Sequence, residues 1–164
     1  MIELRKITVD NIDKVTALDV GEDQKAFIET NNLRSIADAY VLNSDGIPAT
    51  PLAIYADEVV VGFLMYIYDT IDHESFQNED YYKQKTYFIW HFMIGEDFQG
   101  KGYGKLALKK MLVEIETMPY GEAKHVGLFH HKSNIAAKGL YASIGFVNTG
   151  IVQEQSIHAI KKLS

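Results

Sequence analysis

Three glycines occupy every second position between residues 100 and 104, and lysines stand at positions 101 and 105. Glycine reaches backbone conformations that other residues avoid, and it carries no Cβ atom to hold a ligand away. The first N–H groups of a helix have no partner within the helix, and they lie at the positive end of its dipole. A helix that begins in this loop would therefore bind an anion, and the two lysines favour a pyrophosphate.

Two familiar phosphate-binding patterns do not fit this loop. The Walker pattern needs a hydroxyl for magnesium after Gly104 and Lys105, where Leu106 stands, and the dinucleotide pattern needs a different glycine spacing. The pattern that remains, Gln-x-x-Gly-x-Gly from Gln99 to Gly104, resembles the acetyl-CoA pyrophosphate loop of the GNAT superfamily of N-acetyltransferases. The alternative is a glycine turn that only begins an amphipathic helix.

A second segment also resembles the superfamily. Its hallmark, Asn-x-x-Ala-x-x-Leu-Tyr-x-x-x-Gly-Phe, is matched at the same spacing by Asn134, Ala137, Leu140, Tyr141, Gly145 and Phe146. Two independent motifs in the expected order identify the chain as a member of the superfamily.

The elements around the loop can be predicted from residue periodicity. Residues 86–94 are almost all β-branched or aromatic, which predicts a central strand buried on both faces, and residues 105–118 carry apolar side chains at helical spacing. Residues 2–8 alternate between apolar and charged, as in an edge strand. Asp10 is expected to cap the next helix, and residues 22–30 and 35–42 to form two short helices, the second capped by Ser35.

Further along, residues 52–56 and 59–68 predict a hairpin, and residues 69–85 an exposed loop that acts as a lid or an oligomer contact. Residues 124–130 predict a strand, Ser133 caps the helix of the second motif, and residues 145–160 close with a hairpin. This order matches the GNAT fold: one α/β domain over residues 1–164, with a mixed, mostly antiparallel central sheet flanked by helices.

Composition excludes several classes of protein. The 164 residues include no cysteine, which removes disulfides, thiolate metal sites and a cysteine nucleophile. The N-terminus is charged within six residues and no apolar run reaches the length of a membrane span, so we expect a soluble, cytoplasmic protein with no membrane partner. An acidic balance without a basic stripe argues against nucleic acid. Adjacent His130 and His131 point apart and lack a third ligand, so no metal site is expected.

Charge is divided unevenly along the chain. Residues 1–82 hold 5 Lys and Arg against 16 Asp and Glu, whereas residues 83–164 hold 11 against 6, and residues 35–82 contain no Lys or Arg. One half therefore suits an anion and the other a cation. The alternative is that acidic loops only keep the surface solvated.

The resemblance implies acetyl-CoA as the cofactor and direct transfer of its acetyl group to an amine. It implies that backbone groups of residues 92–94 pair with the pantetheine arm, and that the amide of Met93 or Ile94 polarises the acetyl carbonyl. It also implies that Tyr141 protonates the leaving sulfur. A phenol with a pKa near 10 suits that last role. The implied cofactor residues are Phe92, Met93, Ile94, Gln99, Gly100, Lys101, Gly102, Tyr103, Gly104, Lys105, Asn134, Ala137 and Tyr141.

The general base is less well determined. The position where family members often carry a carboxylate holds Trp90, or Phe88 in other branches, and neither accepts a proton. His91 has a suitable pKa, but strand alternation points it to the opposite face from Phe88, Trp90 and Phe92. Glu22 and Asp23, in the segment that walls the amine site in the family, are alternatives, as is an ordered water.

Residues 18–31 are similar to the corresponding segment of bacterial spermine/spermidine acetyltransferases. We therefore expect a small amine, a polyamine in particular, bound by Glu22, Asp23, Tyr66 and Trp90. A protein N-terminus, a lysine or an aminoglycoside is an alternative acceptor, and a catalytically silent CoA-binding sensor is an alternative function. Because family members are commonly dimers, the resemblance allows a homodimer.

Overall fold

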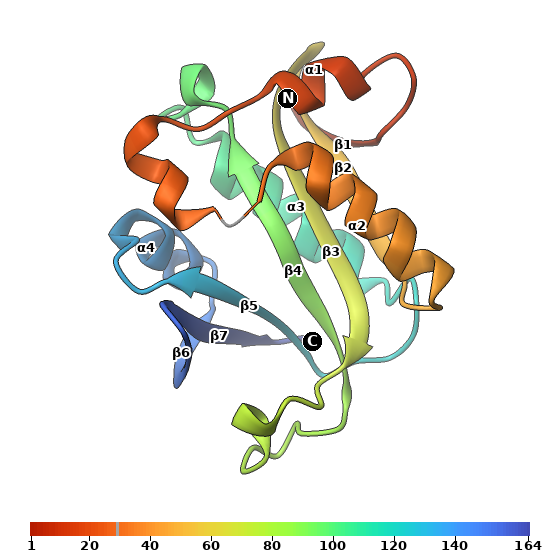
Figure 1. The fold of residues 1–164 in the computed structure, drawn as a ribbon, viewed down its shortest axis with the longest axis vertical. Helices are drawn as coiled ribbons and strands as arrows, with labels where there is room; N and C mark the ends of the chain where they lie inside the picture. Colours follow the sequence, from red (N-terminus) through yellow and green to blue (C-terminus); the bar gives the residue numbers. More distant parts are fainter. Residues whose placement is uncertain (29) are drawn as a thin grey trace.

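The computed structural model describes residues 1–28 and 30–164, which form one sheet with helices on both faces (Figure 1). The seven strands of this region lie in the order β1-β2-β3-β4-β5-β7-β6. Neighbouring strands are antiparallel except for β4 and β5, which are parallel. The predicted fold class, a mixed and mostly antiparallel sheet flanked by helices, is confirmed.

The strands are β1 (Ile2–Lys6), β2 (Ala49–Ala56), β3 (Val59–Thr70), β4 (Lys85–Ile94), β5 (His125–His131), β6 (Val147–Gln153) and β7 (Ser156–Lys162). The α-helices are α1 (Ile12–Ala17), α2 (Asn32–Ser44), α3 (Tyr103–Glu116) and α4 (Ile135–Ser143). Three short 3₁₀ helices are η1 (Glu22–Phe27), η2 (Glu74–Phe76) and η3 (Glu96–Phe98). The predicted strands and hairpins are therefore present. The helix expected at residues 22–30 is a 3₁₀ helix from Glu22 to Phe27, and residue 29 lies outside the described residues.

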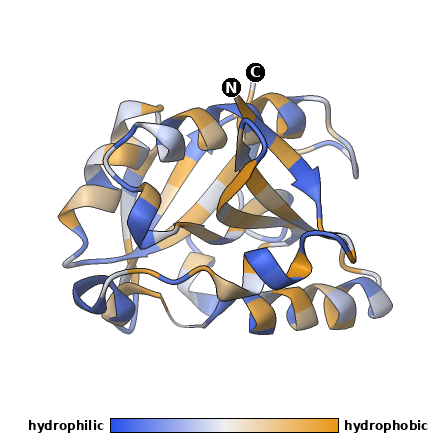
Figure 2. Cartoon of the chain, turned by 90° about the horizontal axis from the view of Figure 1, so that it is seen from above, coloured by the Kyte–Doolittle hydropathy of each residue, from blue (hydrophilic) through white to orange (hydrophobic). Residues whose placement is uncertain are grey.

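Each face of the sheet has its own hydrophobic core. Helices α1 and α2 bury Val15 and Ala39 against Phe63 and Met65 on one face. Helices α3 and α4 cover the other face, and their buried residues include Leu108, Met111, Ile115 and Tyr141. In Figure 2 the central strands are mainly hydrophobic, while the helices on either side carry both hydrophobic and hydrophilic residues. The sheet is thus buried on both sides, as the apolar runs of β3 and β4 predict.

Strand β4 is interrupted in two ways near its middle. It pairs with β5 only from Tyr87 to Ile89, after which the two strands separate (Figure 1). Its register with β3 also shifts, because Ile89 pairs with Tyr66 while His91 pairs with Met65, so that Trp90 is an extra residue. Such a bulge reverses the faces of the residues that follow it.

The segment between β3 and β4 differs from the exposed loop that its sequence predicts. Phe76 and Tyr81 are each only 6% exposed. The Phe76 ring lies 4.9 Å from His158 and 6.1 Å from Phe129, both measured between ring centroids. The segment is therefore held on β5 and β7 by aromatic packing, which sequence periodicity does not reveal.

Three predicted helix caps are wrong by one or more positions. Asn11, not Asp10, precedes α1, and Asn31, not Ser35, precedes α2 and accepts a hydrogen bond from the amide of Arg34. Asn134, not Ser133, precedes α4 in the same way. Asparagine is as good an N-cap as serine or aspartate, so where several such residues lie close together the sequence does not determine which of them caps the helix.

We predict opposite effects for two glycine-to-alanine substitutions. A Cβ atom on Gly62 would lie 2.6 Å from the backbone oxygen of Met93, so Gly62→Ala should lower the free energy of unfolding by about 2 kcal/mol through overpacking. Gly139, within α4, has open space around its Cβ position, so the matched Gly139→Ala should raise the free energy of unfolding by about 0.5–1 kcal/mol. Urea denaturation measures both, and equal effects would contradict the packing described for β3.

A buried histidine should make the fold sensitive to acid. His158 is 1% exposed, and burial lowers its pKa to about 4. Between about pH 6.5, the ordinary pKa, and pH 4 the unfolded chain binds a proton there that the folded chain excludes, so stability falls as the pH falls. In His158→Gln this dependence should be shallower by up to about 1.4 kcal/mol per pH unit. Denaturant titrations across this range measure the slope; an unchanged slope would contradict the prediction, and His73→Gln is the exposed control.

Candidate active site

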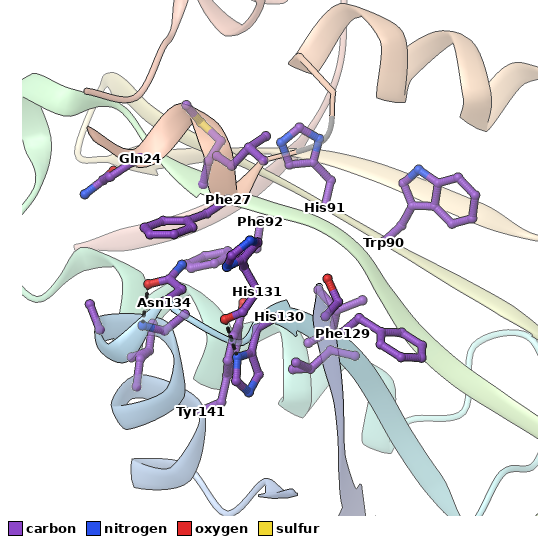
Figure 3. A pocket seen from close by; sticks show the side chains of 18 of the residues that line it. Gln24, Phe27, Trp90, His91, Phe92, Phe129, His130, His131, Asn134 and Tyr141 are labelled. Carbon is purple, nitrogen blue, oxygen red and sulfur yellow. Dashed lines mark hydrogen bonds between the residues drawn. The ribbon is translucent and has the colours of Figure 1, made fainter. Parts of the chain in front are cut away.

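A cleft of about 1390 Å³ lies where β4 and β5 separate. Figure 3 shows Trp90 and His91 on β4 at one side of it, and His130, Asn134 and Tyr141, from β5 and α4, at the other. Residues of η1, the N-terminus of α3 and the segment around η2 complete the wall. The cleft therefore brings together the two sequence motifs, which are separated along the chain.

The glycine loop leads into α3 at one border of the cleft. Gly100 and Gly102 have φ angles of +76° and +80°, in the left-handed region that favours glycine. Gly102 precedes the helix and provides no side-chain cap. The amides of residues 103–105 therefore have no acceptor in the described part of the chain, which is the arrangement that an anion site requires; the pyrophosphate there stays a prediction.

Gly104 allows the helix to approach the strand closely. A Cβ atom there would lie 3.3 Å from the ζ carbon of Phe92 on β4, a contact closer than packed side chains normally make. A side chain at this position would require the Phe92 ring or the start of α3 to shift by a few tenths of an ångström. The glycine thus places the anion site next to the end of the strand.

The first residue of the loop motif has a structural contact. The Gln99 amide nitrogen donates to the backbone oxygen of Ile94 at 2.9 Å, and the side-chain amides of Gln99 and Gln24 donate to each other at 2.8 and 2.9 Å. Gln99 therefore fastens η1 to the loop. Of the two lysines, Lys105 lines the cleft, whereas Lys101 does not and lies with its ammonium 5.8 Å from the Phe98 ring centroid.

The free edge of β4 fits an extended ligand. Beyond Ile89 the strand pairs with β3 but not with β5. Met93 pairs with Phe63 of β3, whereas the backbone groups of Phe92 and Ile94 lie on the other edge of β4, without a strand partner in the described part of the chain. The carbonyl of Ile94 is the exception, because Gln99 occupies it. A ligand with amides along an extended arm can pair with such an edge, as an added strand does. Together with the anion site at α3, this edge fits coenzyme A.

Tyr141 lines the cleft from α4. The residue is 8% exposed, its ring lies 6.1 Å from that of His130, and its hydroxyl makes no hydrogen bond to any residue that the structure describes. Burial raises the pKa of this phenol well above its ordinary value. The hydroxyl therefore carries its proton at neutral pH and is available as a donor.

Asn134 and Ala137 lie at the start of the same helix and line the cleft. The Asn134 side-chain oxygen accepts a hydrogen bond from the amide of Ala137 at 3.1 Å (Figure 3). The side-chain nitrogen of Asn134 has no acceptor among the residues that the structure describes, so the predicted contact with the cofactor is open to it. This motif residue thus caps α4 and borders the cleft at the same time.

His91 lies on the α2 side of the sheet. Its Nδ1 is 2.6 Å from the Oγ of Ser35, its ring packs edge-on against Phe63, and burial lowers its pKa to about 4. It faces away from Phe92, as strand alternation predicts, but it shares its face with Phe88, contrary to that prediction. The bulge at Trp90 is the reason.

The acceptor side of the cleft differs from the one predicted. Trp90 lines the cleft and is 40% exposed, but Tyr66 is fully buried and donates its hydroxyl to Glu114 at 2.5 Å, outside the cleft. Glu22 and Asp23 lie on η1 outside the lining as well, and Glu22 pairs with Lys25 at 2.8 Å. The predicted substrate contacts of Tyr66, Glu22 and Asp23 are therefore not seen.

Other carboxylates line the cleft in their place. They are Asp38 of α2, Glu74 of η2 and Glu154 of the turn between β6 and β7. Asp38 accepts a hydrogen bond from Arg34 at 2.8 Å, while Glu74 and Glu154 form no ion pair within the described residues. None of the three was predicted to contact the substrate, although Asp38 and Glu74 lie in the acidic stretch that was expected to suit a cation, because their place in one cleft depends on the tertiary fold.

Two histidines at the end of β5, which the sequence suggested only as unlikely metal ligands, lie at the cleft. His130 borders the cleft beside Tyr141, and the ring of His131 lies 5.1 Å from Phe27 of η1. Parallel pairing of β4 with β5 would have predicted this position, since the ends of parallel neighbours lie at the same edge of a sheet.

No cluster of three or more potential metal ligands occurs among residues 1–28 and 30–164. Within the same residues, no helix is long and apolar enough to cross a membrane.

Comparison with known proteins agrees with this geometry. Residues 16–146 match the model of the acetyltransferase (GNAT) family. The spermine/spermidine N(1)-acetyltransferase of Bacillus subtilis (strain 168) is 27% identical over 150 residues, which cover 91% of this chain and 90% of that protein.

Solved structures share the fold. The spermidine N-acetyltransferase of Vibrio cholerae, crystallised with CoA and spermine, has a TM-score of 0.67 at 15% identity and covers 98% of this chain and 95% of its own. The PaiA N-acetyltransferase of Thermoplasma acidophilum, crystallised with coenzyme A, has a TM-score of 0.64 at 14% identity and covers 99% of both chains. On its family match and its cleft, the chain belongs to the GNAT family and is an acetyl-CoA-dependent N-acetyltransferase.

Proposed function

We propose that this acetyltransferase acetylates a primary amine of a polyamine such as spermidine or spermine. The observation that carries the proposal is that two carboxylates, Glu74 and Glu154, line the same cleft as Trp90 and form no ion pair with any described residue. The relative from Bacillus subtilis, named for spermine and spermidine, supports the same class of acceptor.

Charge and shape favour a cation with several amines. A carboxylate attracts an ammonium group, and the face of an indole attracts it further when the ring borders a cleft. Residues 35–82, which contribute Asp38 and Glu74, contain no Lys or Arg to repel such a molecule, and Arg34, which lines the cleft beside them, is paired with Asp38. The carboxylates would bind the amines that do not react and so place the remaining one.

The chain's own residues would divide the chemistry as follows. The amides of residues 103–105 and Lys105 hold the negatively charged end of the cofactor, and the free edge of β4 holds its extended arm. When bound, acetyl-CoA supplies an acetyl group activated as a thioester. A backbone amide of β4 polarises the carbonyl under attack, and Tyr141 keeps the proton that a departing thiolate needs.

We predict that Tyr141→Phe lowers kcat by roughly tenfold or more with spermidine or spermine and leaves the KM for acetyl-CoA nearly unchanged. The reason is that phenylalanine keeps the ring but removes the proton donor. Release of CoA measures turnover. Tyr87→Phe is the matched control, because Tyr87 is a buried tyrosine outside the cleft lining that donates its hydroxyl to the backbone oxygen of Gly121.

The same assay tests the acceptor, with putrescine, ornithine, a peptide amine and an aminoglycoside beside spermidine and spermine. Preferred turnover of the polyamines supports the proposal. Ornithine acetylated as well as spermidine, or turnover confined to the peptide or the aminoglycoside, would reject a polyamine acceptor and leave the family membership standing.

We further predict that Glu74→Gln and Glu154→Gln each raise the KM for spermine by roughly three- to tenfold, since each removes a charge that attracts an ammonium group. The KM for acetyl-CoA and that for a simple monoamine should change less than twofold. Asp72→Asn, on the same segment as Glu74 but outside the cleft lining, is the control. Equal loss with spermine and the monoamine would assign the glutamates a structural role instead.

A further inference from the structure

A second, smaller cavity of about 250 Å³ adjoins the cleft. Both are lined by the same five residues, which are Val20, Ile28, Thr30, His91 and Met93. The small cavity continues to Asp19 and Lys25, which form a solvent-exposed ion pair at 3.4 Å. His91 therefore lies where a route from the cleft toward the surface begins.

The contact between Ser35 and His91 determines which ring nitrogen carries the hydrogen. Ser35 is fully buried, and its hydroxyl has no acceptor in the described part of the chain other than the Nδ1 of His91, at 2.6 Å. The buried hydroxyl is satisfied only if it donates to Nδ1. Nδ1 is then unprotonated, and the neutral ring carries its hydrogen on Nε2.

The Nε2 atom is a buried donor without a partner. His91 is 7% exposed, and no atom of the described residues accepts a hydrogen bond from its Nε2. Such groups in folded proteins are usually satisfied by a bound water, provided that the site is roomy and polar. The small cavity has room for several waters, and Asp19, Thr30 and Asn31 give it polar walls.

We propose that the small cavity is the exit for the proton of the acceptor amine, through a chain of waters that Nε2–H of His91 holds in place; this rests on the function proposed above. The ammonium form of the acceptor gives one proton to the water chain, and the chain delivers one proton to bulk solvent near Asp19. His91 remains neutral and Ser35 keeps its hydrogen throughout. His91 is then a positioning residue and not the general base, and Ser35 fixes its tautomer.

The bulge at Trp90 explains why this arrangement was not expected from the sequence. Regular alternation after Ile89 would turn His91 toward α3 and the other core. The extra residue instead directs it toward Ser35 on α2 and the small cavity. The same bulge thus leaves Trp90 exposed and places His91 next to Ser35.

The tautomer can be read without any substrate. We expect long-range ¹H–¹⁵N spectra of the wild-type protein near pH 7 to show His91 with hydrogen on Nε2, and Ser35→Ala to convert it to a mixture of tautomers. The signals are assigned by their loss in His91→Gln. Thr86→Val, which removes another buried hydroxyl of β4, should leave them unchanged. Hydrogen on Nδ1 in the wild type would overturn the proposal.

The proton route is tested with the amine that the wild type turns over best. We expect His91→Leu to lower kcat/KM for that amine at least tenfold near pH 7, and His91→Gln, which keeps an N–H donor, to stay within about threefold of the wild type. The deficit in kcat/KM of His91→Leu should shrink to less than about twofold near pH 9.5, because a larger fraction of the amine is then already deprotonated when it binds. A merely structural loss would persist at both pH values.

The outcomes separate this inference from the proposed function. A deficit in His91→Leu that is independent of pH, or a His91→Gln variant as impaired as His91→Leu, rejects the proton exit even where polyamines are excellent substrates. Absence of turnover with any polyamine rejects the proposed function, while the tautomer measurement still confirms or overturns the Ser35–His91 arrangement. A misfolded His91→Leu variant leaves the spectra of Ser35→Ala and the kinetics of His91→Gln to decide.

Discussion

The separation of β4 from β5 is the constraint on which the rest of the structure depends. A strand edge with open N–H and C=O groups costs free energy unless another group pairs with it. Here β4 loses β5 after Ile89, yet it is supported along its whole length by β3, from Gly62 to Thr70. The sheet therefore stays intact on one side of β4 while the other side is open to an extended ligand. The edge that we expect to bind the cofactor is thus a break in the hydrogen bonding of the sheet.

Helix η1 holds this gap at a defined width. At one side Gln24 exchanges two hydrogen bonds with Gln99 of the glycine loop, and at the other the ring of Phe27 packs on His131 at the end of β5. One short segment thus bridges both walls. A displacement of η1 would therefore disturb its contacts with the glycine loop and with the end of β5 together.

Local patterns predicted the parts of the site that local sequence determines. Strand, glycine loop and helix follow one another between residues 86 and 118, and their interactions are mostly between neighbours in the chain, so their order and role could be predicted. The bulge at Trp90 could not, because it depends on the register with β3. The same holds for Phe76, buried by β5 and β7, and for Tyr66, which looked like a substrate contact but whose hydroxyl bonds to Glu114. What the sequence missed was decided by contacts between distant segments.

Charge in the cleft is ordered in space and not by halves of the chain. Lys105 and the start of α3 supply the positive border, whereas Glu74 comes from the acidic half of the sequence and Glu154 from the basic half. Burial keeps His91 and Tyr141, which line the same cleft, uncharged. In the function proposed above, an anionic cofactor and a cationic acceptor would each be attracted by charge of the opposite sign in this cleft. Because His91 and Tyr141 are buried, a hydrogen bond from either side chain to developing charge would be worth more than the same bond in solvent.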